Sequence, residues 1–195
     1  MSLIADNVDA GDREARSEFL LTDFTANTAD LGWFVVNDNV MGGRSEGGFE
    51  IGSGELIFSG RTNTDGGGFS SIRTQAVEVD LSRRAGIRLR VKGDGRRYTW
   101  RLTTDARWRG RRIAYWADFT TQNGEWQTVN IPFSEFVPRM RGYRLDGPLL
   151  DLRNIAGMGL MIYDREDGPF ELRLGLVGAY STDAPDESPP DGGFE

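Results

Sequence analysis

Neither histidine nor cysteine occurs among the 195 residues of the chain. Without them the chain lacks the residues that activate the nucleophile in Ser-His-Asp and Cys-His enzymes, the usual ligands of zinc, and the His or Cys ligands of haem and iron–sulfur clusters. Disulfide bonds are excluded too, so the hydrophobic core alone must stabilise the fold. These absences predict a protein that is not an enzyme and that uses no metal and no cofactor.

The chain also lacks long apolar runs and a recognisable targeting signal. No segment approaches the roughly 18 apolar residues that a membrane-spanning helix requires. The first ten residues do not show the basic region and apolar stretch of a signal peptide. We therefore expect no membrane span and a cytoplasmic location, where the absence of cysteine fits a reducing compartment.

Lysine is nearly absent, since Lys92 is the only lysine among 23 basic residues. The formal net charge of −7 is unevenly distributed: residues 1–24 carry −4, residues 181–195 carry −5, and the segment between them carries +2. The acidity therefore belongs to the two ends of the chain. A body this close to neutral argues against general binding of nucleic acid.

The one dense basic segment is Arg107–Arg112, which also contains Trp108. Arginines beside an aromatic ring can hold phosphate groups while the ring stacks on a base. We interpret the segment instead as a long loop between strands with solvated arginines. A docking surface for an acidic protein partner is the alternative that we retain.

The body of the chain is rich in glycine and in short runs where apolar and polar residues alternate. Such runs with turn residues between them are typical of antiparallel strands, and the sequence contains no repeat and no alternation of strands with helices. Eight or more short strands in one domain predict an all-β fold, a β-sandwich or jelly roll. The runs that we expect to form strands are 48–51, 55–58, 69–73, 76–79, 87–91, 98–103, 113–119, 126–133, 158–163 and 170–177.

Further features indicate how the domain is bounded. Residues 1–19 form a polar N-terminal segment, with a short helix expected around Asp12–Phe19, and residues 181–195 form an acidic, flexible tail. The β-sandwich domain is expected over residues 20–180. Within it, Gly52–Gly54 predicts a tight hairpin turn, and Pro132 predicts the end of an edge strand.

Alternation along the strands also predicts which side chains are buried. Ile87, Leu89 and Val91 should point inward. The same holds for Tyr98, Trp100 and Leu102 and for the set Phe170, Leu172, Leu174 and Leu176. The outer face of a single sheet would then carry Arg88, Arg90, Arg97, Arg101, Trp116, Asp118, Met161, Tyr163, Glu171 and Arg173.

Two glycine-containing motifs are the most specific features of the sequence. The first comprises Trp33, Asp38, Val40, Met41, Gly42, Gly43 and Ser45. The second comprises Asn63, Gly67, Gly68, Phe69, Ser71 and Arg73. With the stretch from Gly124 to Phe136, these motifs resemble the complex I intermediate-associated protein 30 family over residues 20–180.

The resemblance implies a galactose-binding-like jelly roll and a non-enzymatic scaffold. Family members serve as assembly factors, or chaperones, of NADH:ubiquinone oxidoreductase (complex I), so the implied partners are complex I assembly intermediates. Since relatives of the fold include carbohydrate-binding modules, a carbohydrate ligand is the alternative.

The candidate residues for either ligand combine polar groups, adaptable apolar contacts and exposed aromatic rings. The glycine loop around Met41 has a second interpretation, as a structural loop in which Asn37 and Asp38 bond the local backbone. The tryptophans likewise have packing as the alternative to ligand stacking. The candidates are Asn37, Asp38, Met41, Gly42, Gly43, Arg73, Arg101, Trp108, Trp116 and Asp118.

Two other patterns are weaker. The run Gly66–Gly68 is not a phosphate-binding loop, because no lysine follows at the required spacing and a strand comes next. Asp164, Glu166 and Asp167 could hold calcium through carboxylate oxygens. We interpret these three acids as a solvated turn.

Overall fold

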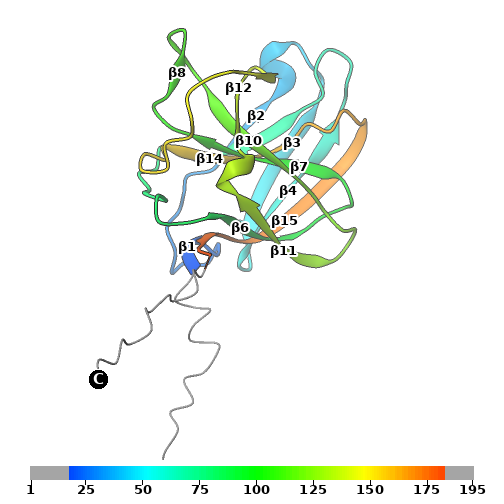
Figure 1. The fold of residues 1–195 in the computed structure, drawn as a ribbon. Coiled ribbons are helices and arrows are strands. Elements are labelled where there is room, and N and C mark those ends of the chain that lie inside the picture. The colour runs from blue at the N-terminus through cyan, green and yellow to red at the C-terminus, as the bar shows by residue number, and fades with distance from the viewer. Residues whose placement is uncertain (1–17, 183–195) are drawn as a thin grey trace, which may run out of the picture.

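In the computed structural model, which describes residues 18–182, two antiparallel β-sheets pack face to face (Figure 1). Sheet I contains, in spatial order, β11 (Trp126–Pro132), β6 (Gly86–Lys92), β15 (Gly168–Tyr180), β4 (Glu55–Thr62) and β3 (Glu46–Gly52), and β1 (Glu18–Thr22) also pairs with β15. Sheet II contains β13 (Tyr143–Arg144), β12 (Val137–Met140), β10 (Ala114–Thr120), β7 (Arg97–Thr103), β14 (Gly157–Ile162), β5 (Ser70–Arg73) and β2 (Phe34–Asn37). The predicted all-β sandwich of the jelly-roll type is confirmed.

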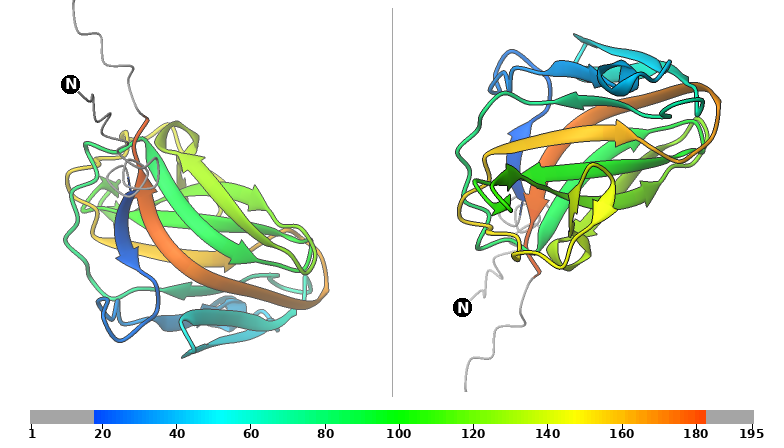
Figure 2. Two further views of the ribbon diagram at one scale, coloured as in Figure 1. Left: turned by 90° about the horizontal axis from the view of Figure 1, so that it is seen from below. Right: turned by 90° about the horizontal axis from the view of Figure 1, so that it is seen from above.

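The two layers are seen edge-on in Figure 2, where β1 runs alongside β15. Pairing of Glu18 with Tyr180 brings the two ends of the described chain together at one end of the sandwich. Helical structure within the described residues is limited to two short 3-10 turns, η1 (Asp38–Met41) and η2 (Phe133–Glu135). Within residues 18–182 no helix has the length and apolar character needed to cross a membrane.

The core between the sheets contains the side chains that alternation predicts. Ile87, Leu89 and Val91 of β6 are fully buried, as are Tyr98, Trp100 and Leu102 of β7. Leu176 is the exception in β15. A register shift between Leu174 and Leu176 reverses the alternation, so Val177 and Ala179 are the next buried residues. The prediction for Leu176 was wrong because a β-bulge inserts one extra residue, which alternation alone does not reveal.

Most of the expected strands are present. The hairpin of β3 and β4 turns at Ser53 and Gly54, which both have positive φ, as a tight two-residue turn requires. The strand β11 lies at the edge of sheet I and ends at Pro132, as predicted.

Several expectations were wrong. Residues 76–79 do not form a strand, because the chain leaves sheet II after β5 and only Val79 makes an isolated bridge, to Ile155. The basic segment is a short hairpin of β8 (Arg107–Trp108) and β9 (Arg111–Arg112) rather than a long loop. The expected helix is contradicted at Glu18 and Phe19, which belong to β1. Its residues 12–17 and the acidic residues 183–195 lie outside the described part of the chain.

The charged residues predicted for one outer face are divided between two. Although β6 and β7 are consecutive in sequence, β6 belongs to sheet I and β7 to sheet II, so their outward side chains point in opposite directions. Arg88, Arg90, Glu171 and Arg173 therefore belong to sheet I. The outer face of sheet II carries Arg97, Arg101, Trp116, Asp118 and Met161. Tyr163 follows directly after the end of β14.

Candidate functional site

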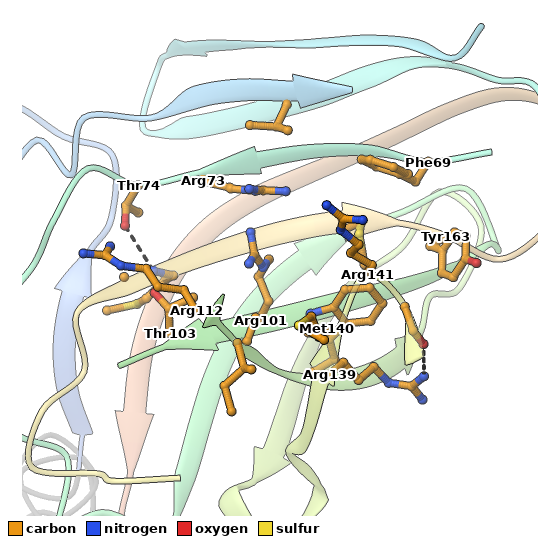
Figure 3. Close-up of a pocket in the computed structure, with 18 of the residues that line it drawn as sticks. Phe69, Arg73, Thr74, Arg101, Thr103, Arg112, Arg139, Met140, Arg141 and Tyr163 are labelled. Carbon is orange, nitrogen blue, oxygen red and sulfur yellow. Dashed lines mark hydrogen bonds between the residues drawn. The ribbon is translucent and has the colours of Figure 1, made fainter. Parts of the chain in front are cut away.

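The outer face of sheet II is hollowed into a cleft of about 850 Å³ (Figure 3). This volume lies in the range of small-ligand pockets, which run from roughly 300 to 1,000 Å³. The cleft is lined from β2, β5, β7, β9, β10, β12 and β14, and from the loops between them. Its lining includes Phe34, Asp38, Phe69, Arg73, Thr74, Arg101, Thr103, Arg111, Arg112, Trp116, Arg139, Met140, Arg141, Gly157, Met161 and Tyr163.

The strand register places four residues in one row across the floor of the cleft. Trp116 lies opposite Arg101, Arg101 lies opposite Gly159, and Gly159 lies opposite Arg73. A Cβ atom on Gly159 would stand 3.0 Å from Cγ and Cδ of Arg101 and 2.7 Å from the carbonyl oxygen of Ile72. Glycine at this position therefore leaves the space that the stem of Arg101 occupies.

The two floor arginines are positively charged and poorly solvated. The Nε atoms of Arg73 and Arg101 are both buried, and neither has a hydrogen-bond acceptor among the described residues. Desolvation, reinforced by the charge of Arg73, lowers the pKa of Arg101 to about 9. Desolvation lowers the pKa of Arg73 as well. A lowered pKa in a cation indicates that the site disfavours its charge, so the pair lacks a compensating acid.

An aromatic wall stands beside the arginines. The ring of Trp116 packs edge-on to Tyr163, with centroids 6.2 Å apart, and Tyr163 packs in the same way on Phe69 at 6.5 Å. The guanidinium of Arg139 lies over the Trp116 ring, 5.5 Å from its centroid, and donates a hydrogen bond of 2.8 Å to the carbonyl oxygen of Gly142. The indole Nε1 of Trp116 is buried and has no acceptor within residues 18–182.

The two glycine motifs meet around the carboxylate of Asp38. This side chain is fully buried and accepts hydrogen bonds from the backbone N–H and the hydroxyl of Ser45, at 2.9 and 2.7 Å, and from the backbone N–H groups of Gly68 and Phe69. Desolvation raises the pKa of Asp38, but these hydrogen bonds outweigh it, and the net pKa lies below 3.8. A Cβ on Gly43 or Gly67 would collide with this carboxylate. Asp38 thus ties the loops together.

The remaining predicted residues divide between the cleft and other roles. Asn37 bonds Gly47 and Ser70, Gly42 has a positive φ of 88° after η1, and Met41 ends η1. Trp108 packs against the core, and Asp118 accepts a hydrogen bond from Thr99. The cleft brings together Asp38, Arg73, Arg101 and Trp116. Among the other predicted residues whose side chains the structure describes, its lining does not include Asn37, Gly42, Gly43, Trp108 or Asp118.

Sequence reasoning missed Arg139 of β12 and Arg141 of the turn that follows, because the hairpin of β12 and β13 was not predicted. It also missed the two floor glycines. Gly157 and Gly159 alternate with the buried residues Met158 and Leu160 along β14. Two glycines on the outer face of a central strand were the signal that could have indicated a hollow there.

The three acids of the Asp164–Asp167 turn do not assemble a metal site. Asp164 receives two hydrogen bonds from the guanidinium of Arg96, at 2.7 and 2.8 Å, and Asp167 accepts one from the backbone N–H of Thr64. Among residues 18–182, no three acidic side chains are grouped so that they could hold an ion.

Comparison with known proteins identifies the family. Residues 22–174 match the family described as complex I intermediate-associated protein 30. The chain belongs to this family. The mouse (Mus musculus) protein named complex I intermediate-associated protein 30, mitochondrial, is 30% identical over an alignment 174 residues long, which covers 78% of this chain and 53% of the mouse protein. The chain thus spans about half the length of that relative.

Two further proteins are similar to this chain. An uncharacterized protein of Schizosaccharomyces pombe is 30% identical over 77% of this chain and 78% of its own length. The family 11 carbohydrate-binding module from Clostridium thermocellum, solved in complex with a β-1,3-1,4-mixed-linked tetrasaccharide, superposes with a TM-score of 0.60 and 22% identity over 85% of this chain and 96% of the module. This likeness confirms the predicted galactose-binding-like fold.

Proposed function

We propose that this chain is a non-enzymatic binding protein that acts as an assembly factor of complex I and holds its protein partner in the cleft of sheet II. The family, and the name of the mouse relative, support an association with complex I intermediates. The lack of histidine and cysteine supports a binding role over a catalytic one.

The observation that carries the proposal is the composition of the cleft. Arginine and tryptophan are the residues most enriched at the energetic centres of protein interfaces, where each combines a large apolar area with hydrogen-bond donors. Trp116 and Arg101 stand side by side in the cleft floor, and the guanidinium of Arg139 lies over the indole ring of Trp116. A partner side chain that enters the cleft would contact all three.

Affinity capture tests this proposal. The immobilised protein is incubated with a lysate of its native host, and bound proteins are identified by mass spectrometry. We expect complex I subunits to bind the wild type and to be lost from the double variant Trp116→Ala/Arg101→Ala. The chain offers a matched control, Trp126→Ala/Arg90→Ala, because Arg90 lies over Trp126 on the opposite outer face.

The two parts of the proposal fail separately. Equal capture by the wild type and the Trp116/Arg101 variant would show that the partner does not use the cleft. If the wild type captures no complex I subunit, the assembly role is wrong.

Carbohydrate binding is the second candidate, and the aromatic wall of Trp116 and Tyr163 favours it. Aromatic faces can stack on sugar rings, and the carbohydrate-binding module with the same fold was solved with a bound tetrasaccharide. Calorimetric titration with that tetrasaccharide decides between the candidates. A saturable heat of binding that disappears in Trp116→Ala would favour carbohydrate as the ligand. If the wild type gives no heat of binding, carbohydrate is ruled out as a ligand.

The cytoplasmic location remains a prediction of the sequence, and the name of the mouse relative places that protein in mitochondria. Fractionation of the native host followed by immunoblotting tests it. Recovery with membranes or with organelles would contradict the prediction.

A further inference from the structure

Unpartnered hydrogen-bond donors concentrate in the cleft. Within residues 18–182, only four buried side-chain polar atoms lack a hydrogen-bond partner. One of them, Nε1 of Trp100, belongs to the core. The other three belong to cleft residues, namely Arg73, Arg101 and Trp116. All three are N–H groups, so each of them can only donate.

This arrangement is unfavourable in the protein by itself. Buried polar groups nearly always have partners, since leaving one unsatisfied costs the desolvation of that group. Here two of the groups also carry like charges, and they flank the same glycine, Gly159. Figure 3 shows Arg101 rising from β7 toward Arg73 on β5. An unfavourable cluster of buried donors that a fold retains indicates a site for an acceptor.

No acid of the described chain supplies that acceptor. Asp38 lines the cleft, but four donors from Ser45, Gly68 and Phe69 already occupy its carboxylate. Asp118 also belongs to sheet II, but it accepts a hydrogen bond from Thr99 and does not line the cleft. Within residues 18–182, therefore, no carboxylate compensates the charge of the two floor arginines.

We propose that Arg73, Arg101 and the indole N–H of Trp116 form a binding site for an oxyanion, and that the partner protein supplies it as the carboxylate of an acidic side chain. The identity of the carrier rests on the proposed function, whereas the oxyanion site rests on the cleft alone. A guanidinium presents paired N–H donors in a planar fork that matches the two oxygens of a carboxylate. Phosphate presents the same kind of acceptor, so the test includes it.

Four more arginines at the cleft support the choice of an anion over a neutral ligand. Positive charge lining a concave site raises the local concentration of anions and speeds their association. A neutral sugar would leave the two floor guanidinium groups uncompensated. The additional arginines are Arg111, Arg112, Arg139 and Arg141.

Thermal unfolding of the purified protein tests the site without any partner. The melting temperature is measured in increasing sodium glutarate, sodium phosphate and sodium chloride at matched ionic strength. We expect glutarate to raise it in a saturable manner, by about 5–10 °C once the concentration reaches about a hundred times Kd, while chloride has little effect. If phosphate stabilises and glutarate does not, the carboxylate assignment is wrong. If neither stabilises, the site itself is wrong.

Two substitutions locate the effect. Arg101→Met keeps much of the side-chain volume and removes the charge, so we expect the glutarate shift to be lost while the melting temperature without ligand stays the same or rises. Arg90→Met, on the outer face of sheet I, is the matched control and should retain the full shift. A full shift in Arg101→Met would overturn the proposal.

A direct signal in the wild type protects the test against a variant that does not fold. The ¹⁵N–¹H resonances of the arginine Nε groups are followed by NMR during the glutarate titration. The Nε–H signals of Arg73 and Arg101 should shift with one common Kd, and that of Arg90 should not.

The failure of this inference and the failure of the proposed function can be told apart. If the protein captures no complex I subunit but still responds to glutarate, only the assembly role is disproved. Capture that survives Arg101→Met would disprove the carboxylate anchor.

Discussion

The hydroxyl group of Ser45 donates a hydrogen bond of 2.7 Å to the carboxylate of Asp38, and this contact closes the loop between these two residues of the first glycine motif. The same oxygen of Asp38 accepts from the backbone N–H of Gly68, in the second motif. The residues that identify the family thus converge on one buried anion. Their role in this region is to hold two loops beside the cleft, which explains why the loops need glycine where a Cβ would meet Asp38.

Replacing this carboxylate should destabilise the fold. In Asp38→Asn, the amide NH₂ would face N–H groups of the loops and leave buried donors unsatisfied. We expect the free energy of unfolding to fall by about 2–4 kcal/mol, measured by urea denaturation. Asp65→Asn is the control, because Asp65 forms an exposed ion pair with Arg44 and should change stability by less than about 1 kcal/mol. Equal losses in both variants would contradict the structural role of Asp38.

The low pKa of Asp38 has a second consequence, for stability in acid. Because the pKa in the folded state lies below 3.8, the ionised carboxylate contributes stability above pH 3.8, and this contribution is lost as pH falls through the folded-state pKa. The difference in melting temperature between the wild type and Asp38→Asn should be constant from pH 5 to 7 and narrow below pH 3.8. Because both proteins contain the same other carboxyl groups, the titration of those groups cancels in this difference. A difference in melting temperature that widens in acid would refute the assignment.

The sequence predicted the architecture well because strand alternation and turn chemistry act locally. The burial of Tyr98, Trp100 and Leu102 could be read from their spacing. The bulge before Leu176 could not, since nothing in the alternation marks an extra residue. The strands β12 and β13 are short, with four and two residues on either side of a tight turn, and they carry no clear alternation.

The candidate site was predicted only in part, for a topological reason. Arg73, Arg101 and Trp116 were each singled out from sequence, but their convergence depends on the order of strands in sheet II. That order inserts β14 between β5 and β7, although β14 is distant from both in sequence. Local patterns also cannot tell which sheet a strand joins, and for this reason Arg88 and Arg90 were placed on the wrong face.

The ion pair between Arg96 and Asp164, the residue after Tyr163 of the aromatic wall, should be important for folding. Arg96 and Asp164 are nearly buried, with side-chain exposures of 11% and 4%, and they pair through two hydrogen bonds. Arg96→Met would leave the carboxylate of Asp164 buried without its partner. We expect a loss of about 3–5 kcal/mol in urea denaturation.

The control for this variant is Arg173→Met. Arg173 pairs with Glu55 and Glu171 at the surface, where ion pairs contribute less than about 1 kcal/mol. A loss from Arg96→Met no larger than that from Arg173→Met would show that the buried pair does not hold the turn of residues 164–168.

The floor of the cleft can be tested through Gly159, whose missing side chain leaves room for Arg101. In Gly159→Ala, the new Cβ would stand 2.7 Å from the backbone carbonyl oxygen of Ile72, which cannot move without disturbing β5, and 3.0 Å from the stem of Arg101. We expect a loss of about 1–3 kcal/mol in stability and a weaker response to glutarate, because Arg101 is displaced from Arg73.

Gly48→Ala is the matched control for that substitution. Gly48 lies in β3 at the edge of sheet I, and a Cβ there would have no neighbour within 4 Å. Its stability should be unchanged or slightly raised, since alanine restricts the unfolded chain more than glycine does. A glutarate response that remains intact in Gly159→Ala would mean that Arg101 reaches the anion from another position. The row Trp116–Arg101–Gly159–Arg73 would then not be the arrangement that binds it.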